Sequence, residues 1–290
     1  MSNFFIWLVS NLPLKVLHLL GVIVGALLRL TKNRNKRVAD INLSICFPDL
    51  APEEHQQLLN KSLIENAKTL LEAFWLWKHP HQALNKHLAD IKNEHLLMRA
   101  KDSDKGTIFV TPHFGSWEYI GLLTAAHTDL WILYAPPKSA YIEKLSCMGR
   151  SGTGGNVVST TNLNLKDLIQ HLKKGGSVGI LPDQVPEGHG GEYAEFFNKK
   201  AYTSTLVCKL ANKLKCHVVL CYALREPTRQ TQYNAYYFDA PQEMFDNDSA
   251  KAVASMNQCI EEYILSSPEN YIWGYKRFKN PAPGDANPYQ

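Results

Sequence analysis

The segment 112–118 holds two side chains that could perform acid–base chemistry. It reads Pro-His-Phe-Gly-Ser-Trp-Glu, and Glu118 follows His113 by five residues. A carboxylate bound to one ring nitrogen of a histidine fixes the tautomer and stabilises the imidazolium that forms when the other nitrogen takes a proton. Because Gly115 lets the chain fold back, we expect Glu118 to meet His113 across the turn, as the partner of a general base. The same spacing also occurs by chance around histidines with a structural role.

Other patterns of catalytic or binding residues are incomplete. Residues 175–179 match the GxSxG of serine hydrolases, but that motif needs a strand before its serine and a helix after it, and here a helix is expected to end at Lys174 with a strand following. The turn 152–156 lacks the dinucleotide fingerprint and a Walker lysine. His113 has no further ligands at a metal-binding spacing, and the six cysteines form no CxxC pair. We therefore expect no metal, no cofactor and cysteines that are reduced thiols.

Alternating strands and helices are expected to position these side chains. Residues 107–111 (TIFVT) are typical of a buried strand and place His113 at its carboxyl end, where open α/β sheets bind ligands. Apolar residues at helical spacing predict a helix over 52–78. Further strands are expected at 131–134, 157–158, 177–181, 217–224 and 233–238, and further helices at 94–101, 139–148, 163–174, 203–214 and 250–265. This order predicts an α/β fold with a mixed, largely parallel sheet flanked by helices.

The composition is that of a globular protein. The chain has 290 residues, of which 45% are hydrophobic and 20% charged, and no linker divides it. Its net charge of +4 is uneven, because residues 1–37 hold six basic residues and no acidic one, while the rest hold 25 basic and 27 acidic residues. The basic charge belongs to the N-terminus, which argues against a nucleic-acid-binding protein.

The N-terminal run 4–30 is mostly apolar and long enough to cross a bilayer, for which about 20 helical residues suffice. Against a full span, a central charge such as Lys15 costs about 2.5–3.5 kcal/mol on insertion scales. A single span and an interfacial anchor therefore both remain open, with a buried N-terminal helix as a third reading. A secretory signal is disfavoured because the positive charges follow the apolar run. We expect a membrane-anchor helix over 1–31 and a catalytic domain over 32–290.

Five segments resemble, in order, the conserved blocks of one enzyme family. The string TPHFGSWEYIG is similar to the H-x4-E block of the bacterial lipid A late acyltransferases, which include the Kdo-lipid IVA lauroyltransferases and are related to the lysophospholipid and glycerolipid acyltransferases. The other four segments are RVADINLSICFPDLAPEE, YAPPKSAYIEKLSCMGR, GILPDQVPEGHGG with FFNKKAYTST, and YIWGYKRFKNPAPG. Together they span nearly the whole chain, which makes them far more specific than His113 and Glu118 alone.

The resemblance implies a role for each matching residue. His113 corresponds to the catalytic base and Glu118 to its carboxylate partner. Arg150 closes the third block, where its charge would stabilise the oxyanion or bind an acceptor phosphate. Asp183 and Gln184 correspond to an Asp-Gln loop that positions or contacts substrate.

The resemblance also implies an activity. The enzyme would move a fatty acyl chain from acyl-carrier protein to a hydroxyl of a lipid A precursor in lipopolysaccharide biosynthesis, with no cofactor and no nucleic-acid partner. It would work at the cytoplasmic face of the inner membrane, in contact with membrane lipids. Two alternatives remain: an acyl-CoA-dependent glycolipid or phosphatidylinositol-mannoside acyltransferase, and a non-catalytic lipid-binding membrane protein.

Overall fold

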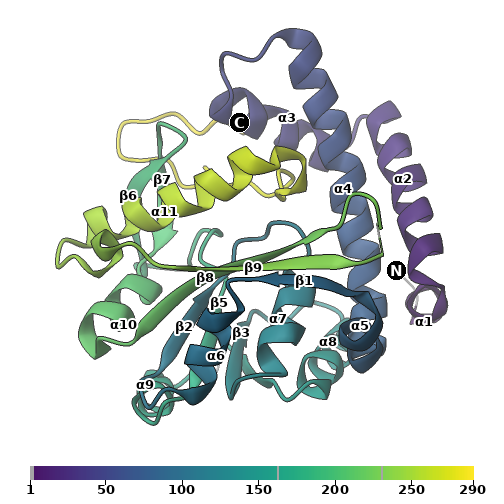
Figure 1. Ribbon diagram of the computed structural model, residues 1–290. Helices are drawn as coiled ribbons and strands as arrows, with labels where there is room; N and C mark the ends of the chain where they lie inside the picture. The colour runs from purple at the N-terminus through teal and green to yellow at the C-terminus, as the bar shows by residue number, and fades with distance from the viewer. Residues whose placement is uncertain (1–2, 162, 230) are drawn as a thin grey trace.

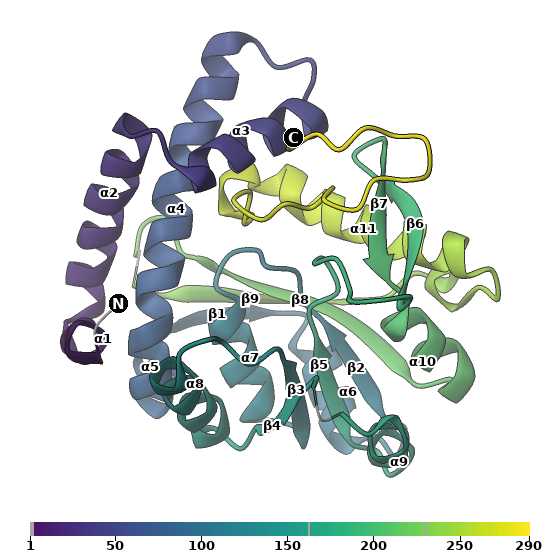
Figure 2. The same ribbon diagram turned by 180° about the vertical axis from the view of Figure 1, so that it is seen from behind.

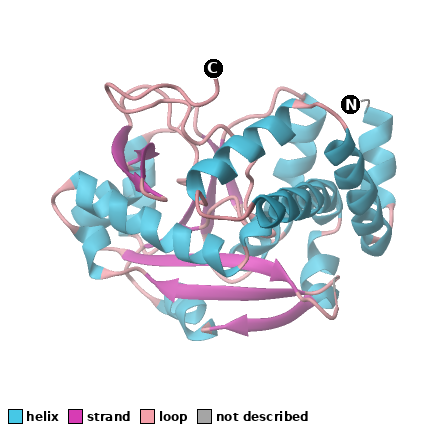
Figure 3. Ribbon diagram, turned by 90° about the horizontal axis from the view of Figure 1, so that it is seen from above, coloured by secondary structure: helices cyan, strands magenta, loops and turns pink. Residues whose placement is uncertain are grey.

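A seven-stranded sheet carries the fold, and helices surround it when the molecule is seen from the front and from above (Figures 1 and 3). The computed structural model describes residues 3–161, 163–229 and 231–290. The strands lie in the order β1-β9-β8-β2-β5-β3-β4, and every neighbouring pair is parallel except β8 with β9. Their bounds are β1 Leu88–Lys92, β2 Thr107–Val110, β3 Leu130–Tyr134, β4 Asn156–Ser159, β5 Ser177–Ile180, β8 His217–Arg225 and β9 Tyr233–Asp239. The predicted mixed, largely parallel sheet is confirmed.

The centre of the sheet is β2, which is buried along its whole length. Val110 at its end is in register with Ile180 of β5 on one side and Leu220 of β8 on the other. A parallel strand covered on both faces must be apolar throughout, which is why the run 107–111 was recognisable in the sequence. The carboxyl ends of β2 and β5 therefore lie side by side at one edge of the sheet.

The helices largely follow the apolar periodicity, and the helix predicted over 52–78 is confirmed as α4. Their bounds are α1 Asn3–Asn11, α2 Leu14–Leu30, α3 Arg34–Cys46, α4 Pro52–Lys78, α5 Pro80–His87, α6 Glu94–Asp102, α7 Trp117–Ala125, α8 Ala140–Gly152, α9 Leu165–Lys173, α10 Leu206–Leu214 and α11 Ser249–Ser266, with short 3-10 helices η1 Gln242–Phe245 and η2 Pro268–Asn270. The sequence did not indicate α3, α5 or β1.

The hairpin of β6 Gly191–Phe196 and β7 Lys199–Ser204 was also not expected. It replaces the beginning of the helix predicted over 203–214, which starts at Leu206 as α10. Its turn residues Phe197 and Asn198 have φ of 50° and 59°. Phenylalanine rarely adopts this left-handed conformation, and glycine is the usual residue at such positions. Because the turn contains no glycine, the sequence did not indicate a hairpin here.

The helix predicted over 1–31 is two helices, and its residues 1 and 2 lie outside the described part of the chain. Pro13 separates α1 from α2, because proline has no amide hydrogen to continue a helix. Among the described residues, no single helix combines the length and the apolar character needed to cross a bilayer; the pair of α2 and α3 meets the length and composition criteria together, but is bent by 81°.

One face of α2 packs along α4, and the two helices lie side by side in both views (Figures 1 and 2). A Cβ atom at Gly21 or Gly25 would come within 2.7 Å or 2.5 Å of backbone atoms of α4, so glycine permits the close approach. His18 is buried in this interface, where its Nε2 lies 2.7 Å from Glu72 Oε2. The opposite face exposes large apolar side chains. These are Val16, Leu19, Val22, Ile23, Val24, Leu27 and Leu30.

Candidate active site

His113 and Asp183 meet at the carboxyl edge of the sheet. Each follows its strand by three residues, after β2 and β5, and the register of these strands places the two positions next to each other. His113 Nδ1 lies 2.8 Å from Asp183 Oδ1, and the backbone N–H of His113 donates to Asp183 Oδ2 over 3.0 Å. The carboxylate thus holds both the imidazole ring and the loop that carries it.

The environment keeps Asp183 ionised. Its side chain is 1% exposed, and this burial by itself raises the carboxyl pKa. The two hydrogen bonds from His113, together with the charge of its ring when it is protonated, outweigh burial and hold the pKa of Asp183 below its ordinary value. An ionised Asp183 accepts the Nδ1 hydrogen, which leaves the lone pair of the ring on Nε2. The amide nitrogen of Gln184 lies 3.2 Å from that Nε2 and donates to it.

Backbone contacts hold the loop of His113 in place. Gly115 has φ of 60°, and a Cβ atom there would lie 2.1 Å from the carbonyl oxygen of Ala223 on β8. The amide of Ser116 donates to the same carbonyl over 2.8 Å. From the C-terminal part of the chain, the Ile272 amide donates to the carbonyl of His113 over 3.1 Å. Glycine is therefore required at position 115 for close packing against β8 as well as for the turn.

Glu118, in the first turn of α7, forms a second buried carboxylate group with other partners. Arg150 on α8 donates through Nε over 3.0 Å and through Nη2 over 2.6 Å to the two carboxylate oxygens. The indole N–H of Trp77 on α4 donates to Glu118 Oε2 over 2.7 Å. Burial raises the pKa of Glu118, but the charge of Arg150 and these hydrogen bonds lower it by more than burial raises it. The pKa of Glu118 is therefore below its ordinary value.

The expected contact between Glu118 and His113 therefore needs a correction. Among the described residues, the carboxylate bonded to the imidazole is Asp183, and the structure gives no hydrogen bond from Glu118 to His113. The physical reason is that Arg150 and Trp77 already occupy the oxygens of Glu118. Glu118 is still close enough to His113 for an imidazolium there to lower the pKa of Glu118.

Direct contacts thus join three of the five residues expected in the site, His113, Asp183 and Gln184, and Glu118 with Arg150 form an adjoining pair. The contact of Trp77 with Glu118 was not predicted from the sequence. A signal for Asp183 was present, because His113 and Asp183 stand at equivalent positions after two predicted strands. This signal predicts a contact between His113 and Asp183 only if the two strands are known to be neighbours in the sheet.

The C-terminal block YIWGYKRF braces the site from outside. Arg277 is 2% exposed and donates to the carbonyl of Tyr202 over 2.9 Å and to the hydroxyl of Thr203. The hydroxyl of Tyr275 accepts from the Val185 amide over 2.9 Å, next to Gln184. Tyr275 thus ties the loop after β5 to the C-terminal block, and Arg277 ties β7 to the same block.

Comparison with known proteins places this sequence in one family. Residues 1–280 match the family model described as bacterial lipid A biosynthesis acyltransferase. The chain is 28% identical over 286 residues to the lipid A biosynthesis palmitoleoyltransferase of Escherichia coli strain K12, covering 98% of this chain and 92% of that protein. It is 26% identical to the lauroyltransferase of the same strain with the same coverage, and 23% identical to its myristoyltransferase, covering 95% and 83%. The chain belongs to the bacterial lipid A biosynthesis acyltransferase family.

Proposed function

We propose that this enzyme transfers a fatty acyl chain from acyl-carrier protein to a hydroxyl of a lipid A precursor of the Kdo-lipid IVA type. The observation that carries the proposal is the polarised imidazole of His113, with ionised Asp183 on Nδ1 and the basic nitrogen Nε2 turned toward the amide of Gln184. Family membership supplies lipid A biosynthesis as the context. The names of the relatives specify palmitoleoyl, lauroyl and myristoyl groups as cargo for those proteins.

The proposed step is a direct acyl transfer. The acceptor hydroxyl takes the place of the Gln184 amide at His113 Nε2 and gives its proton to the ring as its oxygen attacks the thioester carbonyl. The new C–O bond forms, the C–S bond breaks, and the carrier thiolate takes the proton back from the imidazolium. Asp183 stabilises that imidazolium. Backbone amides or a nearby cation would bind the tetrahedral oxyanion.

We assign Glu118 and Arg150 to positioning in this mechanism. The guanidinium of Arg150 is already neutralised by the two oxygens of Glu118, and its charge is therefore committed before any substrate binds. The pair joins α7, which follows the loop of His113, to α8, and through Trp77 to α4. We propose that it fixes the wall of the acyl site next to His113 instead of meeting the oxyanion or an acceptor phosphate.

We further propose that the enzyme works at the cytoplasmic face of the inner membrane. The outer face of α2 presents apolar side chains such as Leu19 and Leu27, which are 60% and 57% exposed. Exposed apolar surface of this extent is typical of a membrane or protein contact. The basic residues that follow α2 favour anionic headgroups. We favour an interfacial anchor, because the other face of α2 is packed against α4.

Product analysis tests the proposed reaction. Purified enzyme is incubated with a tetra-acylated lipid A precursor and either acyl-carrier-protein thioester or acyl-CoA, and products are identified by mass spectrometry. We expect one added acyl ester with the carrier-protein donor, and much less with acyl-CoA. A preference for acyl-CoA would contradict the proposed donor, and absence of any acylated product with active controls would contradict the reaction.

A further inference from the structure

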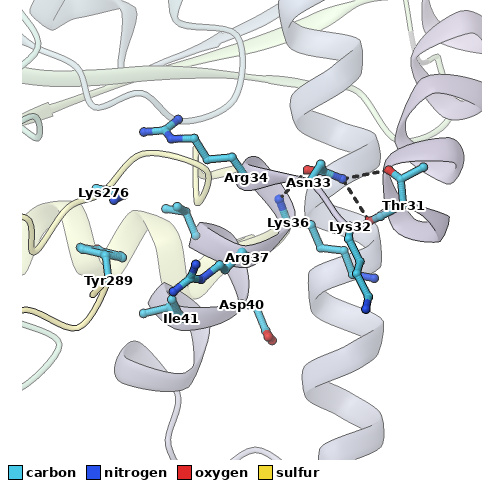
Figure 4. A pocket seen from close by; sticks show the side chains of 11 residues that line it. Thr31, Lys32, Asn33, Arg34, Lys36, Arg37, Asp40, Ile41, Lys276 and Tyr289 are labelled. Carbon is cyan, nitrogen blue, oxygen red and sulfur yellow. Dashed lines mark hydrogen bonds between the residues drawn. The ribbon is translucent and has the colours of Figure 1, made fainter.

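A pocket rich in basic residues lies where α2 ends and α3 begins (Figure 4). It has a volume of about 550 Å³. Its basic side chains come from two distant parts of the chain, and they are Lys32, Arg34, Lys36, Arg37 and Lys276. The side chains of Arg34, Arg37 and Lys276 lie around one opening, with the ring of Tyr289 beside them (Figure 4). We call this feature the basic pocket.

The positive charge of the basic pocket is largely uncompensated. Its one acidic lining residue, Asp40, is bonded to His55 at 2.8 Å. Within the described ranges of the chain, Arg34, Arg37 and Lys276 have no carboxylate within ion-pair distance. Several like charges around one cavity repel one another, and an anion placed among them would relieve that repulsion.

The start of α3 adds to this positive potential. The backbone N–H groups at a helix N-terminus carry a partial positive charge, and acidic residues are favoured there. In α3 the first turn has no acidic residue and instead contains Arg34, Lys36 and Arg37. Both the helix N-terminus and its side chains therefore favour a bound anion. The guanidinium group of arginine can donate two parallel hydrogen bonds to two phosphate oxygens.

The position of the basic pocket indicates where that anion comes from. Leu27 and Leu30 in the last turns of α2 are 57% and 74% exposed, directly before the basic residues. On the other side, Lys276 follows Tyr275, whose hydroxyl accepts from the Val185 amide beside Gln184. The basic pocket thus lies between the apolar face of α2 and the chain that braces the active-site loop. This location fits a lipid headgroup better than an acidic protein, which would not need the apolar neighbour.

We infer that the basic pocket binds a phosphate group of the lipid acceptor, so that the glycolipid headgroup is held while its acyl chain reaches His113. This inference rests on the proposed function, because it takes the acceptor to be a phosphorylated glycolipid. The pocket would contribute ground-state binding of the acceptor, and it would leave the chemical step unchanged.

The test compares two variants that lose the same charge. The variant R34Q/R37Q changes two exposed residues of the basic pocket, and K15Q/R29Q changes two exposed residues of α2 outside it. Binding is measured by co-sedimentation with phosphatidylcholine vesicles that contain the phosphorylated precursor, its dephosphorylated form, or phosphatidylglycerol. We expect R34Q/R37Q to bind the phosphorylated precursor at least about tenfold more weakly, and K15Q/R29Q to change by less than about twofold. On dephosphorylated precursor the wild type and R34Q/R37Q should bind alike.

Steady-state kinetics provide a second readout. R34Q/R37Q should raise KM for the acceptor with kcat and the KM for acyl-carrier protein unchanged. If both variants lost vesicle binding equally, the inference would be wrong and the basic residues would only attract anionic membranes in general. The same conclusion would follow if R34Q/R37Q lost as much binding to phosphatidylglycerol vesicles as to vesicles with the phosphorylated precursor. A raised KM for the carrier protein would make the pocket a protein-docking site and overturn the inference. Since vesicle binding needs no turnover, it separates failure of the pocket from failure of the proposed reaction.

Discussion

The carboxyl edge of the sheet and the N-terminal helices differ in which side chains they bury and which they expose. At the sheet edge, two buried carboxylates, Asp183 and Glu118, each have a positively charged or ionisable partner. On α2, large apolar side chains such as Leu19 and Leu30 remain exposed. The first arrangement fixes the ionisation and geometry of the side chains that we propose to be catalytic. The second leaves apolar side chains exposed, which is typical of a surface that binds a membrane or another protein.

The two regions are joined through a buried cluster around Glu72 on α4. Glu72 is fully buried and accepts hydrogen bonds from Arg225 over 2.9 Å and from the hydroxyl of Tyr233 over 3.0 Å, besides its contact with His18 on α2. Burial raises the pKa of Glu72, but Arg225 and His18 lower it to about 2. An ionised Glu72 therefore fixes α2 against the body of the enzyme.

The largest effect is expected at His113. Replacement by alanine removes the proposed base, and general-base loss predicts a decrease in kcat/KM of at least about a hundredfold. Transfer is measured on detergent-dispersed acceptor, so that membrane binding does not enter. An unchanged thermal unfolding temperature would show that the variant is folded, and near-normal turnover of such folded protein would refute the mechanism.

The two carboxylates are expected to differ in effect. D183N cannot stabilise the imidazolium, and we expect kcat to fall by about a hundredfold with little change in KM. E118Q keeps the shape of the side chain but leaves Arg150 without a charged partner, and we expect a decrease of about tenfold through misplacement of the site. A larger loss for E118Q than for D183N, in folded proteins, would return Glu118 to the role of catalytic partner.

The apolar face of α2 is expected to control membrane binding without affecting chemistry. L19Q/L27Q should weaken binding to vesicles by roughly tenfold, because each substitution removes a leucine side chain that would be partly buried in the membrane interface. The control L165Q/L265Q changes two other leucines, which are 49% and 58% exposed on α9 and α11. Activity on detergent-dispersed acceptor should remain within about twofold for both. Equal loss of vesicle binding in the control would argue against α2 as the anchor.

The smallest effect on activity is expected at Glu72, which should act on stability. Its pKa is depressed in the folded protein, so its contribution is complete above its ordinary pKa of 4.5 and is lost as pH falls toward about 2. E72Q should therefore unfold at a lower temperature than wild type at neutral pH, with the difference shrinking between about pH 4.5 and 2. A difference that is constant over this range would contradict an ionised Glu72 in the folded protein.

Local patterns predicted the parts of the fold that depend on local sequence. The apolar run of β2 and the periodicity of α4 are examples, because burial on both faces and an amphipathic stripe leave a direct pattern in the chain. The helix α3 was missed because three basic residues in its first turn contradict the usual charge preference there. The break at Pro13 was visible, but the apolar run suggested one helix.

The five residues of the candidate site were proposed from the sequence, but the hydrogen-bonded pairs that they form in the structure could not be predicted from it. His113 and Glu118 are close in sequence, which favoured a local contact. The actual partner Asp183 is 70 residues away and is brought to His113 by the adjacency of β2 and β5. Strand order depends on tertiary packing, so no single segment of the chain encodes it. The competition of Arg150 and Trp77 for Glu118 is likewise a property of packed helices.

The most direct test of the central claim, that Asp183 is the carboxylate bound to His113, is observation of the Nδ1 proton of His113. Protein labelled with ¹⁵N-histidine is examined by NMR, with the signal assigned through its loss in H113Q. We expect a hydrogen-bonded, downfield Nδ1 proton in wild type and in E118Q, and its loss in D183N. Loss of that signal in E118Q together with its retention in D183N would show that Glu118, and not Asp183, is the carboxylate bound to His113.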